Sequence, residues 1–409
     1  MNNWLKTTVG FLVSLTVVLI ANGARATTDD QVIAELQAQL AALSARLEQL
    51  ESRQRIPESR YEVPAIAPLA AASTTWADRI RMKGDFRYRH EVIDAEFNGK
   101  RRQRQRIRAR PAFEADITGN LKVGFGLASG GDDPVSSNQT LGDAFSTKGL
   151  NMDLAYFDWS TSIDGLNVRG GKFKNPLHRT GGAGLLWDSD LRPEGISAVF
   201  ERGGLNITAL GLWANESSQS RDELVLGGQA FWSSNFGTEA NLRIGAGYYD
   251  YSGVKGQEVP FDGNARGNSV DDANRYLVGY EELELSAEFA FNIADRGATI
   301  FANYVNNLEA DVFDTGWVIG GAMEFNRGHN PWRLSYAYQD LEADAVFAIF
   351  TDSDFIGGGT DGKGHIIRGS YAVARNVSLR GTLFINQRGG NNGIAEDYNR
   401  LMLDLQLKY

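Results

Sequence analysis

The clearest pattern of apolar and polar positions lies at the end of the chain. Apolar and polar residues alternate there: Leu401, Leu403, Leu405, Leu407 and Tyr409 are separated by polar residues that include Arg400, Asp404, Gln406 and Lys408. A period of two places alternate side chains on opposite faces, so this segment predicts a strand with one apolar and one polar face. Sixteen such segments recur along the chain, beginning near Arg79, Gln105, Leu121, Met152, Leu166, Gly195, Leu205, Leu224, Leu242, Tyr276, Ala298, Trp317, Trp332, His365, Val377 and Arg400.

The connections between these segments alternate in length. Seven are short turns, such as residues 202–204, and eight are long loops, such as residues 174–194. Sixteen antiparallel strands that cross an outer membrane require this alternation, with the short turns in the periplasm and the long loops outside. A soluble β-sandwich gives no reason for it. We therefore predict an all-β fold, a sixteen-stranded antiparallel transmembrane β-barrel, over residues 76–409.

The N-terminal part follows a different period. Apolar residues are spaced by three and four at Ile33, Leu36, Leu40, Leu43, Leu47 and Leu50. This a/d seam predicts an α-helical coiled coil over residues 27–56, which we place in the periplasm. A single amphipathic helix remains an alternative. Pro57, Pro64 and Pro68 then predict an extended linker over residues 57–75.

The first 26 residues match a secretory signal peptide. Lys6 supplies the basic region, the apolar run of residues 9–21 is short, and Ala24-Arg25-Ala26 is a cleavage pattern. An uncleaved membrane anchor is the alternative. The signal directs the chain out of the cytoplasm, which agrees with its lack of cysteine.

Composition removes two classes of protein. The mean hydropathy of -0.31 is too low for a bundle of membrane helices. The net charge of -10 argues against nucleic acid as a partner. We expect no cofactor and no metal site, because the clustered aspartates of two long loops fit no EF-hand spacing; loop-bound calcium stays an alternative. These clusters are Asp262, Asp271 and Asp272, and Asp352, Asp354 and Asp361.

Positive charge is concentrated in the first two predicted strands. Residues 79–110 hold twelve Lys/Arg and four Asp/Glu, a surplus of eight positive charges in a chain whose net charge is -10. These charges alternate with apolar residues, and a charge on the lipid face would cost about 2–4 kcal/mol. We therefore expect a pore-lining basic strip, which consists of Arg81, Lys83, Arg87, Arg89, Arg106, Arg108 and Arg110.

A register for this hairpin follows from the loop between its strands. We expect Arg89 opposite Arg106, Arg87 opposite Arg108, Asp85 opposite Arg110 and Arg81 opposite Glu114. Like charges that face each other are destabilising, so something negative must offset the outer half. Two interpretations stay open: the strip attracts anionic solutes, or it is a structural ladder paired with acids from a loop and from strands that include Glu282, Glu284 and Glu288.

The third long loop, residues 174–194, combines charge with flexibility, which makes it a candidate for a constriction once the family resemblance given below is added. It carries charged residues together with Gly181, Gly182 and Gly184, which supply flexible points. We expect its charged residues to narrow the lumen, and these are Lys174, Arg179, Asp188 and Asp190. An ordinary exposed loop is the alternative.

Several short motifs resemble the putative porin family of Gram-negative outer membranes. They are Gly171-Lys172-Phe173-Lys174-Asn175-Pro176, residues 186–191, residues 193–195, Ala155-Tyr156-Phe157 and the alternating arginines from Arg106 to Arg110. The first is also similar to phosphate-selective porins. The resemblance implies passive diffusion of small hydrophilic solutes, commonly through a homotrimer, without enzymatic activity. It also implies a place in the outer membrane and, as in trimeric porins, a third long loop that folds inward. Lipopolysaccharide is a further expected partner, because its phosphates could offset the basic strip. Tyr409 after alternating leucines resembles the carboxy-terminal signal that the barrel-assembly machinery reads.

Two other functions are compatible with a barrel. An outer-membrane hydrolase needs a nucleophile beside a base, but His90, His178, His329 and His365 are scattered without a recognisable partner. A structural barrel could instead be tethered to the periplasm or peptidoglycan through its coiled coil.

Overall fold

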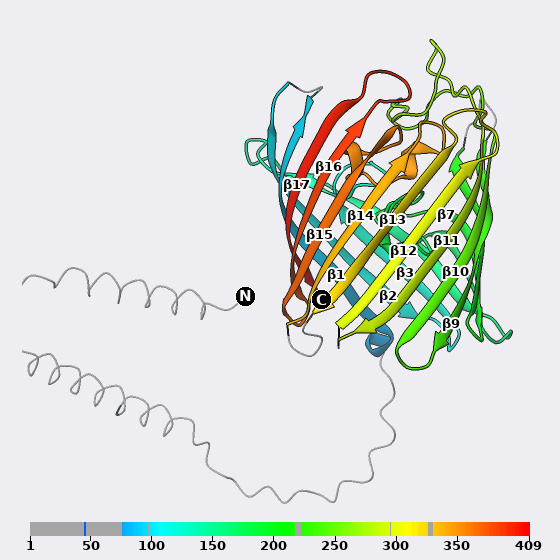
Figure 1. Ribbon diagram of the computed structural model, residues 1–409. Coiled ribbons are helices and arrows are strands. Elements are labelled where there is room, and N and C mark those ends of the chain that lie inside the picture. Colours follow the sequence, from blue (N-terminus) through cyan, green and yellow to red (C-terminus); the bar gives the residue numbers. More distant parts are fainter. Residues whose placement is uncertain (1–44, 46–75, 97–98, 217–221, 295, 326–329) are drawn as a thin grey trace, which may run out of the picture. The chain divides into compact units, whose positions relative to one another are not determined.

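The computed structural model describes Ala45 and residues 76–96, 99–216, 222–294, 296–325 and 330–409. Sixteen long antiparallel strands form a closed β-barrel (Figure 1). They are β1 (Ile80–Ala95), β2 (Arg102–Asp116), β3 (Leu121–Ser129), β5 (Leu150–Ser160), β6 (Leu166–Lys172), β7 (Glu194–Arg202), β8 (Leu205–Asn215), β9 (Glu223–Phe236), β10 (Ala240–Ser252), β11 (Tyr280–Ile293), β12 (Arg296–Asn307), β13 (Thr315–Phe325), β14 (Trp332–Leu341), β15 (Gly362–Ala374), β16 (Val377–Arg388) and β17 (Glu396–Lys408). The label β4 belongs to a two-residue strand, Gln139–Thr140, in the second long loop.

Pairing between the first and last strands closes the barrel. β1 pairs with β2 on one side and with β17 on the other, where Asp85 lies opposite Lys408. The backbone of the final residue, Tyr409, exchanges two hydrogen bonds with Gly84. The sixteen-stranded antiparallel barrel predicted from the sequence is therefore confirmed, and each strand begins within four residues of its predicted start.

The strand faces follow the predicted alternation. On β1, Met82 and Tyr88 are 58% and 40% exposed on the outside, whereas Arg87 and Arg89 are buried inside. The register of the first hairpin is also as predicted: Arg89 faces Arg106, Arg87 faces Arg108, and Asp85 faces Arg110. A charge that faces lipid is costly, so the charged residues of each strand face the lumen and the apolar residues face outward.

The long loops lie at one end of the barrel and the short turns at the other (Figure 1). The 3-10 turn η1 (Trp76–Arg79), which precedes β1, and the C-terminus both lie at the short-turn end. The predicted signal peptide, coiled coil and linker fall outside the described residues, apart from Ala45, which is helical. No helix in the described part of the chain is long and apolar enough to span a membrane.

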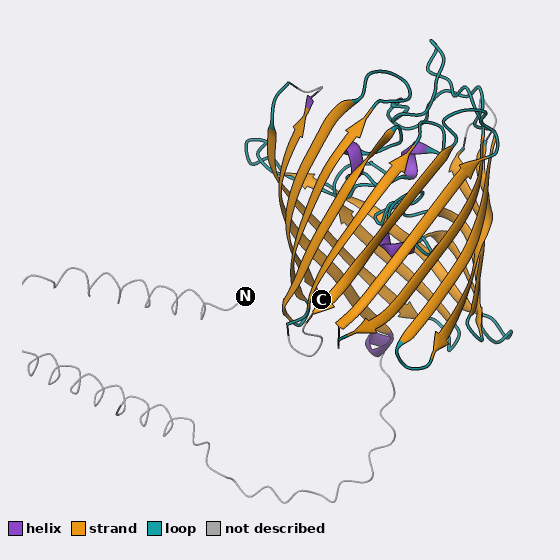
Figure 2. Ribbon diagram, viewed as in Figure 1, coloured by secondary structure: helices purple, strands orange, loops and turns teal. Residues whose placement is uncertain are grey.

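Two of the long loops fold inward. We call residues 173–193, between β6 and β7, the third loop, and residues 342–361, between β14 and β15, the seventh loop. Their short helical turns are η3 (Thr180–Gly182), η4 (Ala348–Phe350) and η5 (Phe355–Gly357), which lie within the barrel outline in Figure 2. Both loops contribute to the main buried apolar cluster, so the interior of the barrel contains a hydrophobic core.

Candidate functional site: the barrel lumen and its two inward loops

The third loop crosses the lumen from one wall to the other. On one side His178 Nε2 lies 2.9 Å from Glu288 Oε2 of β11, and the Gly181 amide donates to the other oxygen of that carboxylate. On the other side Asp190 accepts hydrogen bonds from Arg108 and Arg110 of β2, at 2.9 and 2.8 Å. The loop is thus attached to both walls by charged groups.

Gly181 allows this loop to lie close against β12. Its φ of +62° lies in the left-handed region, which side chains with a Cβ rarely adopt. A Cβ at this position would lie 2.4 Å from the ring of Phe301. The glycine that the sequence marked as a flexible point is therefore required by a close contact.

The seventh loop forms most of the internal core, and the sequence analysis missed this. Its apolar run, Ala343–Phe350, contains Ala345, Phe347 and Ile349, which are at most 4% exposed. Backbone amides of the loop bind inward acids: Phe347 donates to Glu282 and Ser353 donates to Asp188, both at 2.8 Å. An apolar run inside a long polar loop was the available signal, because an exposed loop has no reason to carry one.

Aromatic rings join the two loops to the barrel wall. Trp187 of the third loop packs edge-on against Tyr249, with ring centroids 5.1 Å apart, and stacks near Phe350 of the seventh loop. The other members of the cluster are Tyr251, Tyr276, Tyr280 and Phe347. Burial of each large ring contributes roughly 1.5–3 kcal/mol, which holds both loops inside the barrel.

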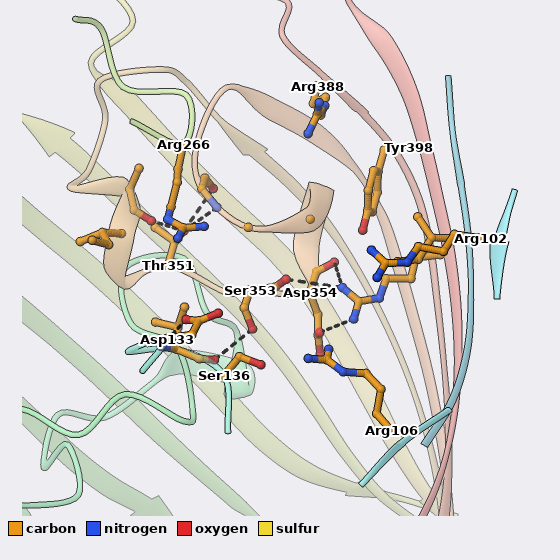
Figure 3. Close-up of a pocket in the computed structure, with 18 of the residues that line it drawn as sticks. Arg102, Arg106, Asp133, Ser136, Arg266, Thr351, Ser353, Asp354, Arg388 and Tyr398 are labelled. Atoms are coloured by element: carbon orange, nitrogen blue, oxygen red, sulfur yellow. Dashed lines mark hydrogen bonds and ion pairs between the residues drawn. The ribbon is translucent and has the colours of Figure 1, made fainter. Parts of the chain in front are cut away.

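Two of the cavities beside this core are lined by charged residues of the lumen. The inner cavity has a volume of about 660 Å³ and lies against β1, β14, β15 and β16. The outer cavity has a volume of about 290 Å³ and is shown in Figure 3. Ser353 and Asp354 of the seventh loop line both cavities, so this segment separates one from the other.

The residues of the predicted basic strip occupy different positions in the lumen. Arg87 and Arg89 line the inner cavity, and Arg106 lines the outer one. Arg108 and Arg110 lie between Asp85 and Asp190. Nearer the short-turn end, Arg81 pairs with Asp116 and Lys83 pairs with Glu114.

Most of this strip is neutralised by carboxylates. Arg89 binds Asp404 of β17 at 2.7 Å and Asp354 of the seventh loop at 3.1 Å. Under the structural-ladder interpretation, Glu282, Glu284 and Glu288 could also pair with the strip, but the structure places each of them against other groups. Glu282 accepts a hydrogen bond from the seventh-loop amide of Phe347, and Glu288 accepts one from the third-loop amide of Gly181. Glu284 accepts hydrogen bonds from Gln229, Asn303 and Tyr249. The strip pairs instead with Asp190 and Asp354 of the inward loops and with strand acids such as Asp85 and Asp404.

Two arginines of the strip differ from the rest. Arg87 forms no ion pair with a described residue; it donates to Asn138, and its buried Nε has no hydrogen-bond partner there. Arg106 approaches Glu91 only to 3.8 Å, and its Nε is likewise without a partner among the described residues. Their charge is therefore the least offset in the strip.

The loop carboxylates fall into two classes. Burial and the charges of Asp352 and Asp190 raise the pKa of Asp188 well above its ordinary value. Burial also acts to raise the pKa of Asp190, but Arg108 and Arg110 hold it well below that value. In the seventh loop, burial and Asp354 raise the pKa of Asp352. The pKa of Asp354, which burial would raise, is held low by Arg400 and Arg89.

The four residues expected to form the constriction do not all reach the lumen. Arg179, Asp188 and Asp190 line the inner cavity. Lys174 lines neither cavity and is exposed at the base of the loop. Sequence reasoning also missed four arginines of the inner cavity, because each stands alone on the polar face of its strand: Arg243, Arg333, Arg368 and Arg380.

The described histidines lie apart from one another, and His329 falls outside the described residues. His90 lies beside Gln105, and His365 beside Tyr336 on the outer face. Within the residues that the structure describes, no group of three His, Cys, Asp or Glu is arranged to hold a metal ion.

A closed sixteen-stranded barrel with inward loops and a charged lumen is the architecture of an outer-membrane porin. The sequence profile of the putative porin family matches residues 94–280 and 274–409, so the chain belongs to that family. Membership of this family implies a porin channel in the outer membrane of Gram-negative bacteria rather than an enzyme.

One solved structure in particular agrees with this fold. OprB of Pseudomonas putida, in its high-pH structure, superposes with a TM-score of 0.55 at 12% identity, covering 81% of this chain and 94% of that one. A mutant of Rh. blastica porin gives a TM-score of 0.48 at 17% identity, covering 81% of this chain and 100% of that one. No curated protein matches the chain in sequence.

Proposed function

We propose that this porin prefers anions. One observation carries the proposal: thirteen arginines but only seven carboxylates line the two cavities, although the whole chain has a net charge of -10. A surplus of fixed positive charge in a narrow, low-dielectric passage raises the local concentration of anions and repels cations. Arg87 and Arg106 supply the least neutralised part of this surplus.

The arrangement of charges supports a second feature of the same pore. Six arginines of the inner cavity project from wall strands, whereas Asp188, Asp190, Asp352 and Asp354 belong to the inward loops. Opposed charges across the passage orient a dipolar solute. We therefore propose that the third and seventh loops together form the constriction, with Arg179, Asp188 and Asp190 on its loop side.

Reversal potentials in a potassium chloride gradient test the preference. For the wild-type protein in a planar bilayer, the reversal potential is expected to be shifted from zero toward the equilibrium potential of chloride. The double variant R87Q/R106Q removes the two least offset charges, so its reversal potential should move toward zero. R375Q, in the short turn between β15 and β16 and outside both cavities, is the control and should leave the potential unchanged. Cation preference in the wild type would refute the proposal.

The assembly and the N-terminal segment belong to the same proposal. We propose a homotrimer, with the coiled coil of residues 27–56 in the periplasm and with lipopolysaccharide around the long loops. Both η1 and the C-terminus lie at the short-turn end, which supports a periplasmic position for the preceding residues. The half-exposed Tyr409, which follows alternating leucines, supports recognition by the barrel-assembly machinery. The native mass of the detergent-purified protein tests the trimer.

A further inference from the structure

The outer cavity has a composition that the pore does not require. Six arginines line it, from β2, β16, β17 and the loop between β10 and β11: Arg102, Arg104, Arg106, Arg266, Arg388 and Arg400. The carboxylates that line it are Asp133 and Asp354. Figure 3 shows Arg266 on the opposite side of the cavity from Arg102 and Tyr398.

Nearby carboxylates neutralise only part of this charge. The fully buried Glu91 behind the wall binds Arg104 and Arg400. Asp354 binds Arg400 at 2.9 Å, and Asp262 binds Arg266. Arg388 lies opposite Glu396 on the neighbouring strand. Asp354 is also shared with Arg89 of the inner cavity. The six arginines of the outer cavity therefore still outnumber the carboxylates near them, even when Glu91, Asp262 and Glu396 are added to Asp133 and Asp354.

Several guanidinium groups also have unused donors. The Nε atoms of Arg106, Arg266 and Arg400 are buried and make no hydrogen bond with a described residue. A buried donor without a partner costs roughly 1–3 kcal/mol, more when it is charged. Three such donors around one cavity are explained if an oxyanion accepts from them, because arginine matches carboxylate geometry.

The lining is not wholly polar. Ile93, Val135 and Ile349 are buried apolar residues that line the same space, and the ring of Tyr398 lies at its edge. The cavity is larger than an inorganic oxyanion needs. Basic groups on two sides with apolar surface between them fit an anion that carries charge at both ends of a short carbon chain.

We propose that the outer cavity is a binding site for small organic dicarboxylates, which it holds in front of the inner cavity. Arg102 and Arg266 bind the two ends, and the apolar residues contact the carbon chain. Because Ser353 and Asp354 line both cavities, the bound anion lies next to the passage into the lumen. This site names a solute class for the proposed anion-preferring pore and rests on that function only in part, since the cavity exists whatever the selectivity.

Block of chloride current by succinate tests the site. Succinate is added on the long-loop side of the full protein in a planar bilayer, and the concentration for half block is measured. R102Q/R266Q should raise that concentration about tenfold, because each substitution removes a charge-assisted hydrogen bond. The control R101Q/R275Q removes two exposed arginines from the same two loop regions, outside the cavity, and should change it less than twofold.

Three results would overturn the proposal. These are equal shifts in both double variants, the absence of block in the wild type, and stronger block by inorganic phosphate than by succinate. The chloride conductance without succinate shows whether each variant forms a channel; if R102Q/R266Q does not, R102Q alone, whose side chain is exposed, must weaken the block. If the channel prefers anions but succinate does not block it, this site is rejected and the proposed function stands. If the channel prefers cations but succinate blocks it, the proposed function is rejected and the site stands.

Discussion

Asp354 is the residue that connects the two cavities. It accepts from Arg89, which lines the inner cavity, and from Arg400, which lines the outer one. Both arginines keep another acid, Asp404 and Glu91 respectively. The loss of Asp354 therefore leaves neither of them without a partner, which makes it a suitable position at which to change the lumen charge.

We expect D354N to increase the preference for anions. The substitution removes one negative charge from the segment that separates the cavities, while the amide keeps the shape of the side chain. The chloride-to-potassium permeability ratio, measured from the reversal potential, should rise. D311N removes an exposed carboxylate from the loop between β12 and β13 and should have no effect, since salt screens a charge so far from the passage. An unchanged ratio in D354N would contradict the expected role.

The pKa values of the loop carboxylates predict a dependence on pH. Asp188 and Asp352 have raised pKa values, so they take up protons first as the pH falls from neutrality. Asp190 and Asp354 have depressed pKa values and stay charged. Anion preference should therefore increase in mild acid, and the double variant D188N/D352N should lose most of this increase. An increase of the same size in that variant would assign it to other groups.

The docking of the third loop depends on pH in a different way, through Asp190. The pKa of Asp190 in the folded protein lies below the ordinary value of about 3.9. Its ion pairs with Arg108 and Arg110 therefore stabilise the docked loop at any pH above that ordinary value. The stabilisation is lost only as the pH falls through the depressed pKa, so the loop is expected to stay docked in mild acid.

At the scale of elements, the seventh loop is the clearest target. The residues that flank it, Leu341 and Gly362, are direct partners in the β14–β15 ladder. A two-residue Asn-Gly turn can therefore replace residues 342–361 without a change in register. The loop fills space inside the barrel, whereas the sixteen-stranded ladder does not depend on it.

Replacement of the seventh loop should increase single-channel conductance. The passage widens because the aromatic cluster loses Phe347 and Phe350. The anion preference should change as well, since Asp352 and Asp354 are removed with the loop. The control replaces residues 308–313, in the loop between β12 and β13, where exposed Leu308 and Val312 line neither cavity. Equal conductance in the two replacements would show that the seventh loop does not limit flow.

At the scale of the whole molecule, the barrel closes without the N-terminal residues. The pairing of β1 with β17 and the Gly84–Tyr409 hydrogen bonds lie within residues 80–409. Deletion of residues 27–73 should therefore leave single-channel conductance within about twofold, because no group that lines the cavities is removed. Envelope adhesion should change more if the coiled coil acts as a tether. A large fall in conductance would instead make the segment part of the pore.

The sequence by itself determined the strands, their number, the face that each residue occupies and the register of the first hairpin. These follow from local rules: a period of two sets the faces, membrane thickness sets the strand length, and a charge on the lipid face is too costly. Tertiary structure decided which acids neutralise the arginines. Asp190, Asp354 and Asp404 lie roughly 80 to 315 residues away from the arginines that they bind. No local spacing encodes such a contact, because it exists only once the barrel closes and two loops fold into it to bury their aromatic rings.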